Sequence, residues 1–228
     1  MRRAAGRRAR PRGSHAAWEP PDPDAAAILS AQDPARLPQY VSIRYGRMST
    51  SSFAFFRGAA VVMAADLAGS PVSGMTVQLH GDAHLVNFGL YASPERTLLF
   101  DINDVDETLP GPWEWDVKRL AASAVIAGRA NGFDAGACRR AALAAVRSCR
   151  ECMGRYAAMG DLAVWYSRIA AEDALAIARR TKGIRVKATE RGVTKARTRD
   201  NLQALAKLTA VVDGRLRIVD DPPLVSAP

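Results

Sequence analysis

The feature that most constrains the fold is a run of short strand patterns, residues 75–112, between two long helical stretches. Met75–Leu79 alternates in polarity as a strand does, and the polar loop His80–Asn87 follows it. Phe88–Tyr91 and Thr97–Phe100 are predicted to be two further strands, joined by Ala-Ser-Pro-Glu-Arg into a hairpin. Strands so few and so short cannot form a large sheet, so helices must supply most of the core.

The acidic segment Asp101–Gly111 is predicted to be a loop, closed by Pro110-Gly111-Pro112. One helix is expected to begin near Asp24, and Pro38 is expected to interrupt its pattern further along the chain. Helices are also predicted at Ser52–Leu67, which is apolar enough to be buried, and at Trp113–Ala130, Asp134–Met159, Leu162–Arg180 and Asn201–Val211. Asp213-Gly214 is a turn signal for a last hairpin. These patterns predict an α+β protein that is mostly helical.

The chain of 228 residues, 48% of them hydrophobic, can bury one sizeable core. It has no run of about 18 apolar residues that would span a membrane, and no apolar stretch follows the N-terminal arginines as in a secretory signal. We therefore expect a cytoplasmic protein. Cys149 and Cys152 form a C-x-x-C pair, but with Cys138 they lie in a helical pattern without nearby histidines. We interpret all three as small helix residues rather than a zinc or redox site.

The net charge of +9 is concentrated in two segments. Residues 1–13 carry +6 and residues 179–199 carry +8, which leaves the rest of the chain at −5. Residues 1–22 are predicted to be a disordered basic leader. The second segment could contact phosphate groups, but it has no aromatic residue to stack on bases, and we favour a solvated helix face with a loop. Nucleic-acid binding is therefore not favoured.

The polar loop contains the residue types that phosphoryl transfer from ATP requires. Such a site needs a divalent cation on the phosphates and a carboxylate that orients the attacking hydroxyl. Mg²⁺ takes carboxylate or amide oxygens together with phosphates and water. The hairpin between the two loops is expected to bring Asp82, Asn87 and Asp101 together. Asp82 would then hold the nucleophile, and Asn87 and Asp101 would bind the metal.

His80-Gly81-Asp82-x-His84-x-x-Asn87 resembles the catalytic loop of aminoglycoside phosphotransferases and other kinase-like enzymes. In that family a hydrophobic strand ends in a metal-binding Asp about fourteen residues after the Asn, as Leu98-Leu99-Phe100-Asp101 does here. Trp115-Asp116-Val-Lys-Arg-Leu120 is similar to the family's helix opening, whose Asp supports the catalytic loop by hydrogen bonds. The resemblance implies a fold like the C-terminal lobe of a protein kinase, with the small hairpin carrying the site.

A wider resemblance runs from about Tyr40 to Pro223. The segments FAFFRGAA, GDAHLVNFG and FDINDVDETLPGPWEWDVKRLAAS are similar to the uncharacterised bacterial family called domain of unknown function 2252. The chain departs from it at Ser52, where Pro is usual, and at Val105, where Phe is usual. Members are longer at the C-terminus, with a Gly-rich segment and a strand Lys. Residues 23–228 are thus expected to be one kinase-like catalytic domain, incomplete at its C-terminus, whose nucleotide-binding residues are unknown. This chain alone is expected not to turn over ATP.

Each site residue also has a plainer interpretation. Asp82 could cap the following turn and Asn87 could bond its own backbone. His80 is interpreted as structural support, whereas His84 could contact substrate or support the loop. The full set is catalytic Asp82 and His84, metal-binding Asn87, Asp101 and Asp104 (with Asp106 able to assist), and supporting His80 and Asp116. Arg47 and Arg57 could reach an anionic ligand or pair with the acidic loop.

Three functions compete. The leading hypothesis is a Mg²⁺- and ATP-dependent phosphotransferase acting on an unidentified small-molecule or protein hydroxyl. A non-catalytic pseudoenzyme or truncated family member is the second, because the sequence has no G-x-G-x-x-G segment. A metal-dependent phosphoesterase is the third, since Gly-Asp-x-His also occurs in metallophosphatases. Their metal sites usually contain more histidines than His80 and His84 would supply. The sequence does not indicate the substrate or the oligomeric state.

Overall fold

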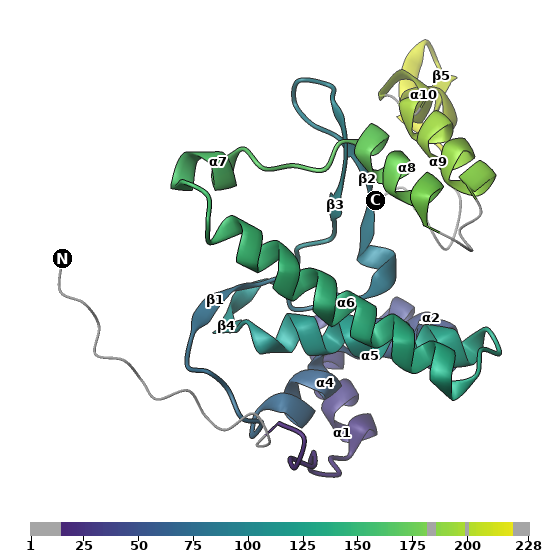
Figure 1. Ribbon diagram of the computed structural model, residues 1–228. Coiled ribbons are helices and arrows are strands. Elements are labelled where there is room, and N and C mark those ends of the chain that lie inside the picture. The colour runs from purple at the N-terminus through teal and green to yellow at the C-terminus, as the bar shows by residue number, and fades with distance from the viewer. Residues whose placement is uncertain (1–14, 182–185, 199–200, 221–228) are drawn as a thin grey trace. The chain divides into compact units, whose positions relative to one another are not determined.

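The computed structural model describes residues 15–181, 186–198 and 201–220 (Figure 1). Its contacts divide the chain into two compact units. The first comprises Met1–Phe88 and Ile102–Tyr166, and the second comprises Gly89–Asp101 and Ser167–Pro228. Each unit is described by itself. The predicted leader falls largely on residues 1–14, outside the described ranges, and the single domain over residues 23–228 stays a prediction.

The first unit opens with short helices whose starts follow from capping residues. Helix α1 (Ala25–Ser30) begins as predicted after Asp24, whose carboxylate accepts the backbone N–H groups of Ala26 and Ala27 at 3.0 Å. A 3₁₀ turn, η2 (Asp33–Ala35), separates it from α2 (Pro38–Met48). Pro38 occupies the first helical position of α2, where its missing N–H costs nothing. The expected interruption at Pro38 is wrong, because α1 already ends at Ser30 and Pro38 starts the next helix.

The predicted single helix Ser52–Leu67 is wrong: the structure has α3 (Ser52–Gly58) and α4 (Ala60–Leu67). The helix breaks at Ala59, with φ −120° and ψ 39°. Side chains from elsewhere in the unit take the carbonyls that would continue it, because Arg44 donates to the Gly58 oxygen at 2.6 Å and Arg119 donates to the Phe56 oxygen at 2.9 Å. Tertiary contacts therefore override the local helical pattern.

Burial of this segment is also less complete than expected. Ala59 and Leu67 are buried, but Phe55 is 40% exposed and most other residues are half-buried. Ala59 joins Leu29 and Met48 in a small hydrophobic cluster. The first helices of the unit therefore pack around this cluster instead of enclosing one central helix.

Strand β1 (Thr76–Leu79) lies where it was predicted, but its partner was not foreseen. It pairs antiparallel with β4 (Leu109–Pro112), with Leu79 opposite Leu109. The prediction of a loop through Gly111 is wrong over these residues. Proline has no backbone N–H and is therefore unfavourable in an inner strand. This sheet has two strands, so a proline can direct the side that lacks an N–H toward an open edge, where no hydrogen bond is lost.

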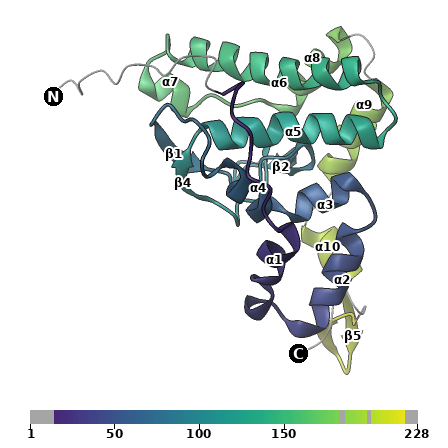
Figure 2. The same cartoon turned by 90° about the horizontal axis from the view of Figure 1, so that it is seen from below.

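After β4 the first unit is mainly helical. It contains α5 (Glu114–Ala130), α6 (Ala135–Tyr156) and the short α7 (Asp161–Trp165). Helices α5 and α6 run side by side (Figure 2). They approach closely at Gly128, where a Cβ would lie 2.7 Å from the Cys138 sulfur. All three cysteines are free thiols on α6, as the helical interpretation requires.

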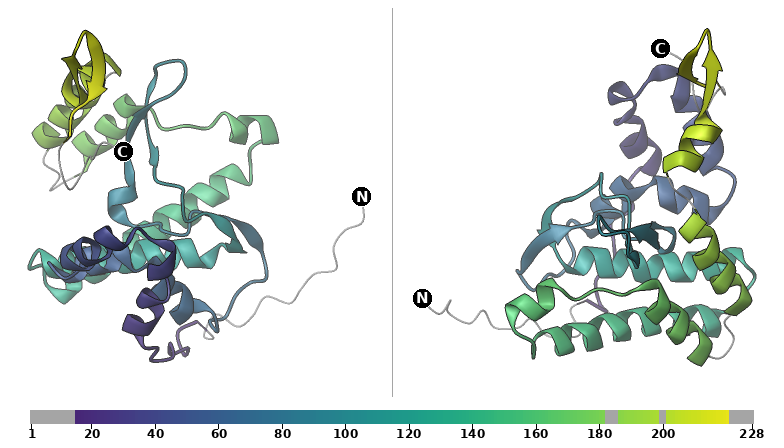
Figure 3. Two further views of the ribbon diagram at one scale, coloured as in Figure 1. Left: turned by 180° about the vertical axis from the view of Figure 1, so that it is seen from behind. Right: turned by 90° about the horizontal axis from the view of Figure 1, so that it is seen from above.

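The second unit contains a hairpin, three helices and a second hairpin. Strands β2 (Phe88–Ala92) and β3 (Leu98–Ile102) pair as predicted, with their terminal residues Phe88 and Ile102 assigned to the first unit. Helices α8 (Ala171–Arg180), α9 (Val186–Thr198) and α10 (Asn201–Leu208) follow. Strands β5 (Thr209–Val212) and β6 (Arg215–Ile218) then form the expected last hairpin (Figure 3).

The predicted helix Leu162–Arg180 is also wrong, because residues 166–170 are not helical. Phe100 of β3 donates its N–H to the Ile169 oxygen at 2.9 Å, and Leu99 forms a bridge with Ala170. This strand pairing replaces the helical hydrogen bonds at that point. In the basic segment 179–199, Arg179 and Arg180 end α8 and residues 186–198 form α9, and Arg179 and Arg197 pair with Glu190 and Glu172, respectively.

The described residues thus form a mixed α+β protein that is mostly helical, as expected. Within these ranges, no helix is both long enough and apolar enough to cross a membrane.

Candidate functional site

The polar loop His80–Asn87 is held from one side by the first turn of α5. Asp116 accepts the backbone N–H of His80 on Oδ2 at 2.7 Å and that of Gly81 on Oδ1 at 3.1 Å. Both carboxylate oxygens are therefore used by consecutive amides, and these are the hydrogen bonds expected of Asp116. The start of the loop is fixed to the helix by charge-assisted bonds, which are roughly twice as strong as neutral ones.

The same helix also holds the far end of the loop. Ser123, which is fully buried, accepts the Leu85 N–H at 3.2 Å and donates to the Leu120 oxygen at 2.7 Å. The sequence analysis missed Ser123. Its distance of seven residues from Asp116 places both on one face of α5, and that spacing was the available signal.

The acidic segment lies directly against the loop. The His80 ring nitrogen Nε2 donates to the Asn103 oxygen at 2.7 Å, and Nδ1 accepts the Asp82 N–H at 3.2 Å. Asn103 in turn donates its N–H to the Asn87 oxygen at 2.6 Å. Because both ring nitrogens of His80 have backbone partners, its side chain has no free nitrogen for proton transfer, which agrees with a supporting role.

Gly81 is the point of closest approach between the two segments. Its φ of +84° lies in the left-handed region, which favours glycine. A Cβ there would lie 2.1 Å from the carbonyl oxygen of Glu107. Both the conformation and the space require glycine, so the Gly-Asp pair of the motif has a geometric cause.

Asp82 forms an ion pair that the sequence analysis did not foresee. Its Oδ1 accepts the Arg119 Nε at 2.6 Å and also contacts Arg119 Nη2. Arg119 is 2% exposed, donates from Nη2 to the Phe56 oxygen at 2.9 Å, and stacks 4.3 Å from the Phe56 ring. Arg119 therefore links α3 to the loop and leaves only Oδ2 of Asp82 for other partners. Its spacing of three residues from Asp116 could have identified it.

His84 lies beside the free oxygen of Asp82. Its Nε2 is 3.5 Å from Asp82 Oδ2, and its ring meets that of Phe53 edge-on at 6.3 Å. Burial lowers the pKa of the His84 imidazole, and the charge of Arg119 lowers it further, while the Asp82 carboxylate opposes this shift. The ring is therefore neutral at neutral pH. Among the described residues, its buried Nδ1 has no hydrogen-bond partner.

Asn87 is buried and oriented by the loop itself. Its Nδ2 donates to the Asp82 carbonyl at 3.0 Å, so the amide oxygen faces away from that bond. An amide oxygen of this kind is a ligand type that Mg²⁺ accepts. Asp104 is exposed, with φ +64°, and follows Asn103 directly. Asp101 is exposed on β3 in the second unit, so its role as a metal ligand stays a prediction.

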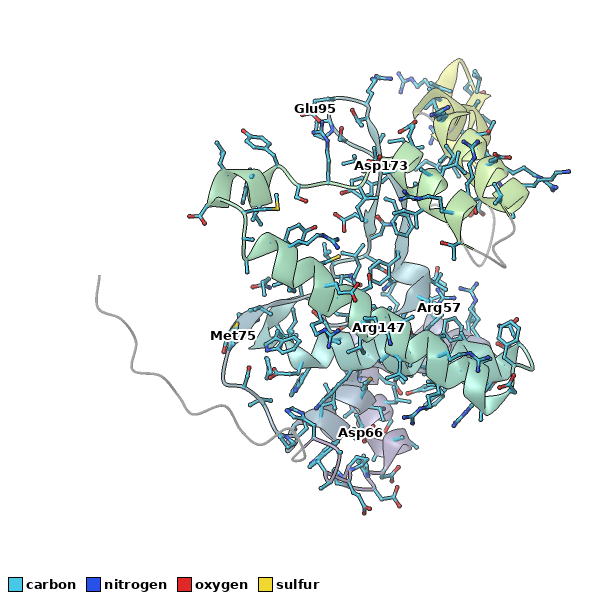
Figure 4. The ribbon with its side chains drawn as sticks, viewed as in Figure 1. Arg57, Asp66, Met75, Glu95, Arg147 and Asp173 are labelled. Atoms are coloured by element: carbon cyan, nitrogen blue, oxygen red, sulfur yellow. The ribbon has the colours of Figure 1, made fainter. Side chains whose placement is uncertain are left out.

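The structure thus brings together His80, Asp82, His84, Asn87 and Asp116 in one unit. In the part of the chain that the structure describes, no group of three His, Cys, Asp or Glu side chains is gathered closely enough to hold a metal ion. Arg57, labelled in Figure 4, ends α3 and is near enough to lower the pKa of His84. Arg47 is an exposed residue in the last turn of α2.

These features define an α+β protein with a helix-braced polar loop. The model of a family described as uncharacterized protein conserved in bacteria (DUF2252) matches residues 36–228, and the chain belongs to that family. No curated protein and no solved structure matches the chain.

Proposed function

We propose that the chain carries the catalytic loop of a kinase-like phosphotransferase that transfers phosphate from Mg-ATP to a hydroxyl group. The substrate would be a small molecule or a protein. The observation that carries the proposal is the environment of Asp82. One oxygen is fixed by a buried arginine and the other, Oδ2, lies beside neutral His84 on a loop braced at both ends. A carboxylate held in this way can orient an attacking hydroxyl and accept its proton.

The roles of the other residues follow from their contacts. Asn87, through its amide oxygen, would hold Mg²⁺, with Asp104 as a further oxygen donor, and Asp101 is the other metal ligand predicted from the sequence. The cation would neutralise the phosphates of ATP. His80 and Asp116 would keep the loop in place through the backbone bonds described above. A fold like the C-terminal lobe of a protein kinase, in a bacterial cytoplasmic enzyme, belongs to the same proposal.

One observation favours a non-catalytic protein instead. The Asp82–Arg119 pair is well satisfied by itself, so Asp82 could serve only to tie the loop to α3 and α5. The sequence also has no G-x-G-x-x-G segment to cover phosphates. A metal-dependent phosphoesterase has no comparable support, since the described residues gather no set of three metal-binding side chains.

The test is Mg²⁺-dependent consumption of ATP by the chain extended with the family's Gly-rich segment. Asp82→Asn should abolish turnover. The control Glu151→Gln, which also replaces a carboxylate by a carboxamide but at an exposed position on α6, should leave turnover unchanged. The double variant Asp82→Asn/Arg119→Met removes both charges and separates a loss of chemistry from a loss of folding. It should fold better than Asp82→Asn and still be inactive. Turnover that survives in Asp82→Asn would refute the phosphotransferase proposal.

A further inference from the structure

Behind the polar loop, the first unit contains a cavity of about 170 Å³. Helix α4 forms one wall through Ala60, Val61 and Ala64, and Leu79 of β1 and Leu109 of β4 form another. Its lining is mainly apolar, yet Gly81, Asp116 and Arg119, which fix the position of Asp82, also line it. An occupant of this cavity would therefore touch the residues that hold the loop.

Among the buried polar side-chain atoms of the lining, one has no partner in the described residues, while Glu107 and Gln32, which also line the cavity, are exposed and half-buried, respectively. Asp116 uses both oxygens on loop amides, and Arg119 is bound to Asp82, to the Phe56 oxygen and to the Met63 sulfur. Trp115 also lines the cavity, and its indole N–H is buried with no acceptor among the described residues. Buried donors are nearly always paired in folded proteins, so this N–H calls for a partner.

We propose that this cavity binds a small neutral molecule, about the size of one six-membered ring, that carries a hydrogen-bond acceptor for Trp115. The volume sets the size, because an apolar cavity of about 150 Å³ in another protein holds benzene. The paired state of Asp116 and Arg119 sets the charge, since neither has a free site for an ionic ligand and Glu107, the remaining charged residue of the lining, is exposed to solvent. The buried unpartnered donor sets the chemistry, which is a carbonyl or ether oxygen. This inference does not depend on the proposed phosphotransfer.

The test uses acetophenone, one ring with a carbonyl, and measures the indole N–H signals of the four tryptophans by ¹H–¹⁵N NMR on the full chain. The signal lost in Trp115→Phe identifies Trp115. Acetophenone should shift this signal in a saturable way. Ethylbenzene, which has the same shape without the oxygen, should shift it at least several-fold less, and 2-acetonaphthone, with two rings, should not shift it.

A matched variant shows whether the effect comes from the cavity. Ala64→Leu places extra carbons in the cavity wall and should abolish the shift while the other three indole signals stay in place. Ala60→Val, one turn earlier on α4, serves the same purpose if Ala64→Leu does not fold. A Trp115 signal that does not respond to acetophenone would overturn the proposal. An equal response in the filled variants would also overturn it. So would strong magnetisation exchange between the Trp115 indole N–H and water, which would show that only a buried water occupies the site.

Discussion

Replacing Arg119 by Met is predicted to destabilise the first unit by about 3 to 5 kcal/mol. Arg119 is 2% exposed and the side chain of its partner Asp82 is 14% exposed, so the pair is shielded from water. Methionine keeps part of the packing but leaves the Asp82 carboxylate without its cation and the Phe56 oxygen without its donor. A single domain is stable by about 5 to 15 kcal/mol, so the loss should be unmistakable.

Urea unfolding followed by tryptophan emission measures this loss. The four tryptophans, Trp18, Trp113, Trp115 and Trp165, all lie in the first unit, so their emission reports on that unit. Asp82→Asn alone leaves a buried guanidinium unpaired and should also be costly. The double variant should be more stable than the sum of the two losses implies, by about 2 kcal/mol.

The control is Arg147→Met on the exposed face of α6, which should change the free energy of unfolding by less than about 0.5 kcal/mol. Two results would refute the reasoning. One is an Arg119→Met variant as stable as the control, which would mean that the buried pair contributes nothing. The other is strict additivity in the double variant, which would mean that the two side chains do not interact.

Three further predictions concern the same loop. Gly81→Ala should destabilise by at least about 3 kcal/mol in urea unfolding, whereas Gly132→Ala, with a similar φ of +76° and open space around it, should cost about 1 kcal/mol; equal losses would contradict the contact with the acidic segment. Asp116→Asn offers one acceptor in place of two, so hydrogen exchange at the amide of residue 80 or 81 should accelerate by at least tenfold while the β1 amides stay unchanged. Because burial lowers the pKa of His84 below its ordinary 6.5, the unfolded chain binds the proton more readily, and the free energy of unfolding should fall as the pH is lowered below about 6.5. His84→Gln should flatten that part of the profile, and an unchanged slope would exclude His84 as its cause.

Much of the fold could be predicted from local signals. The caps at Asp24 and Asp134 mark the starts of α1 and α6, and the turn at Asp213-Gly214 marks the last hairpin. What the sequence did not reveal depends on partners far along the chain. The break at Ala59 follows from arginines of α2 and α5, and the break before α8 follows from pairing with β3. No local pattern contains that information.

The candidate site shows the same division. The motif predicted that Asp116 would hold the loop, and the hydrogen bonds to His80 and Gly81 are present. Arg119 and Ser123 were missed although they share a face of α5 with Asp116, because an arginine or a serine in a helix of mixed charged and apolar residues has many ordinary explanations. Their importance becomes visible only when the loop is placed against that face.

The proposed phosphotransfer depends on a divalent cation at the polar loop, with Asn87 as a ligand and Asp82 beside it. Mn²⁺ is a paramagnetic substitute for Mg²⁺, so adding it in stoichiometric amounts should broaden the ¹H–¹⁵N amide signals of residues 82 and 87 together. Excess Mg²⁺ should restore them, and Asn87→Ala should prevent the effect. Broadening that appears at only one of these positions, or that persists unchanged in Asn87→Ala, would contradict a shared site.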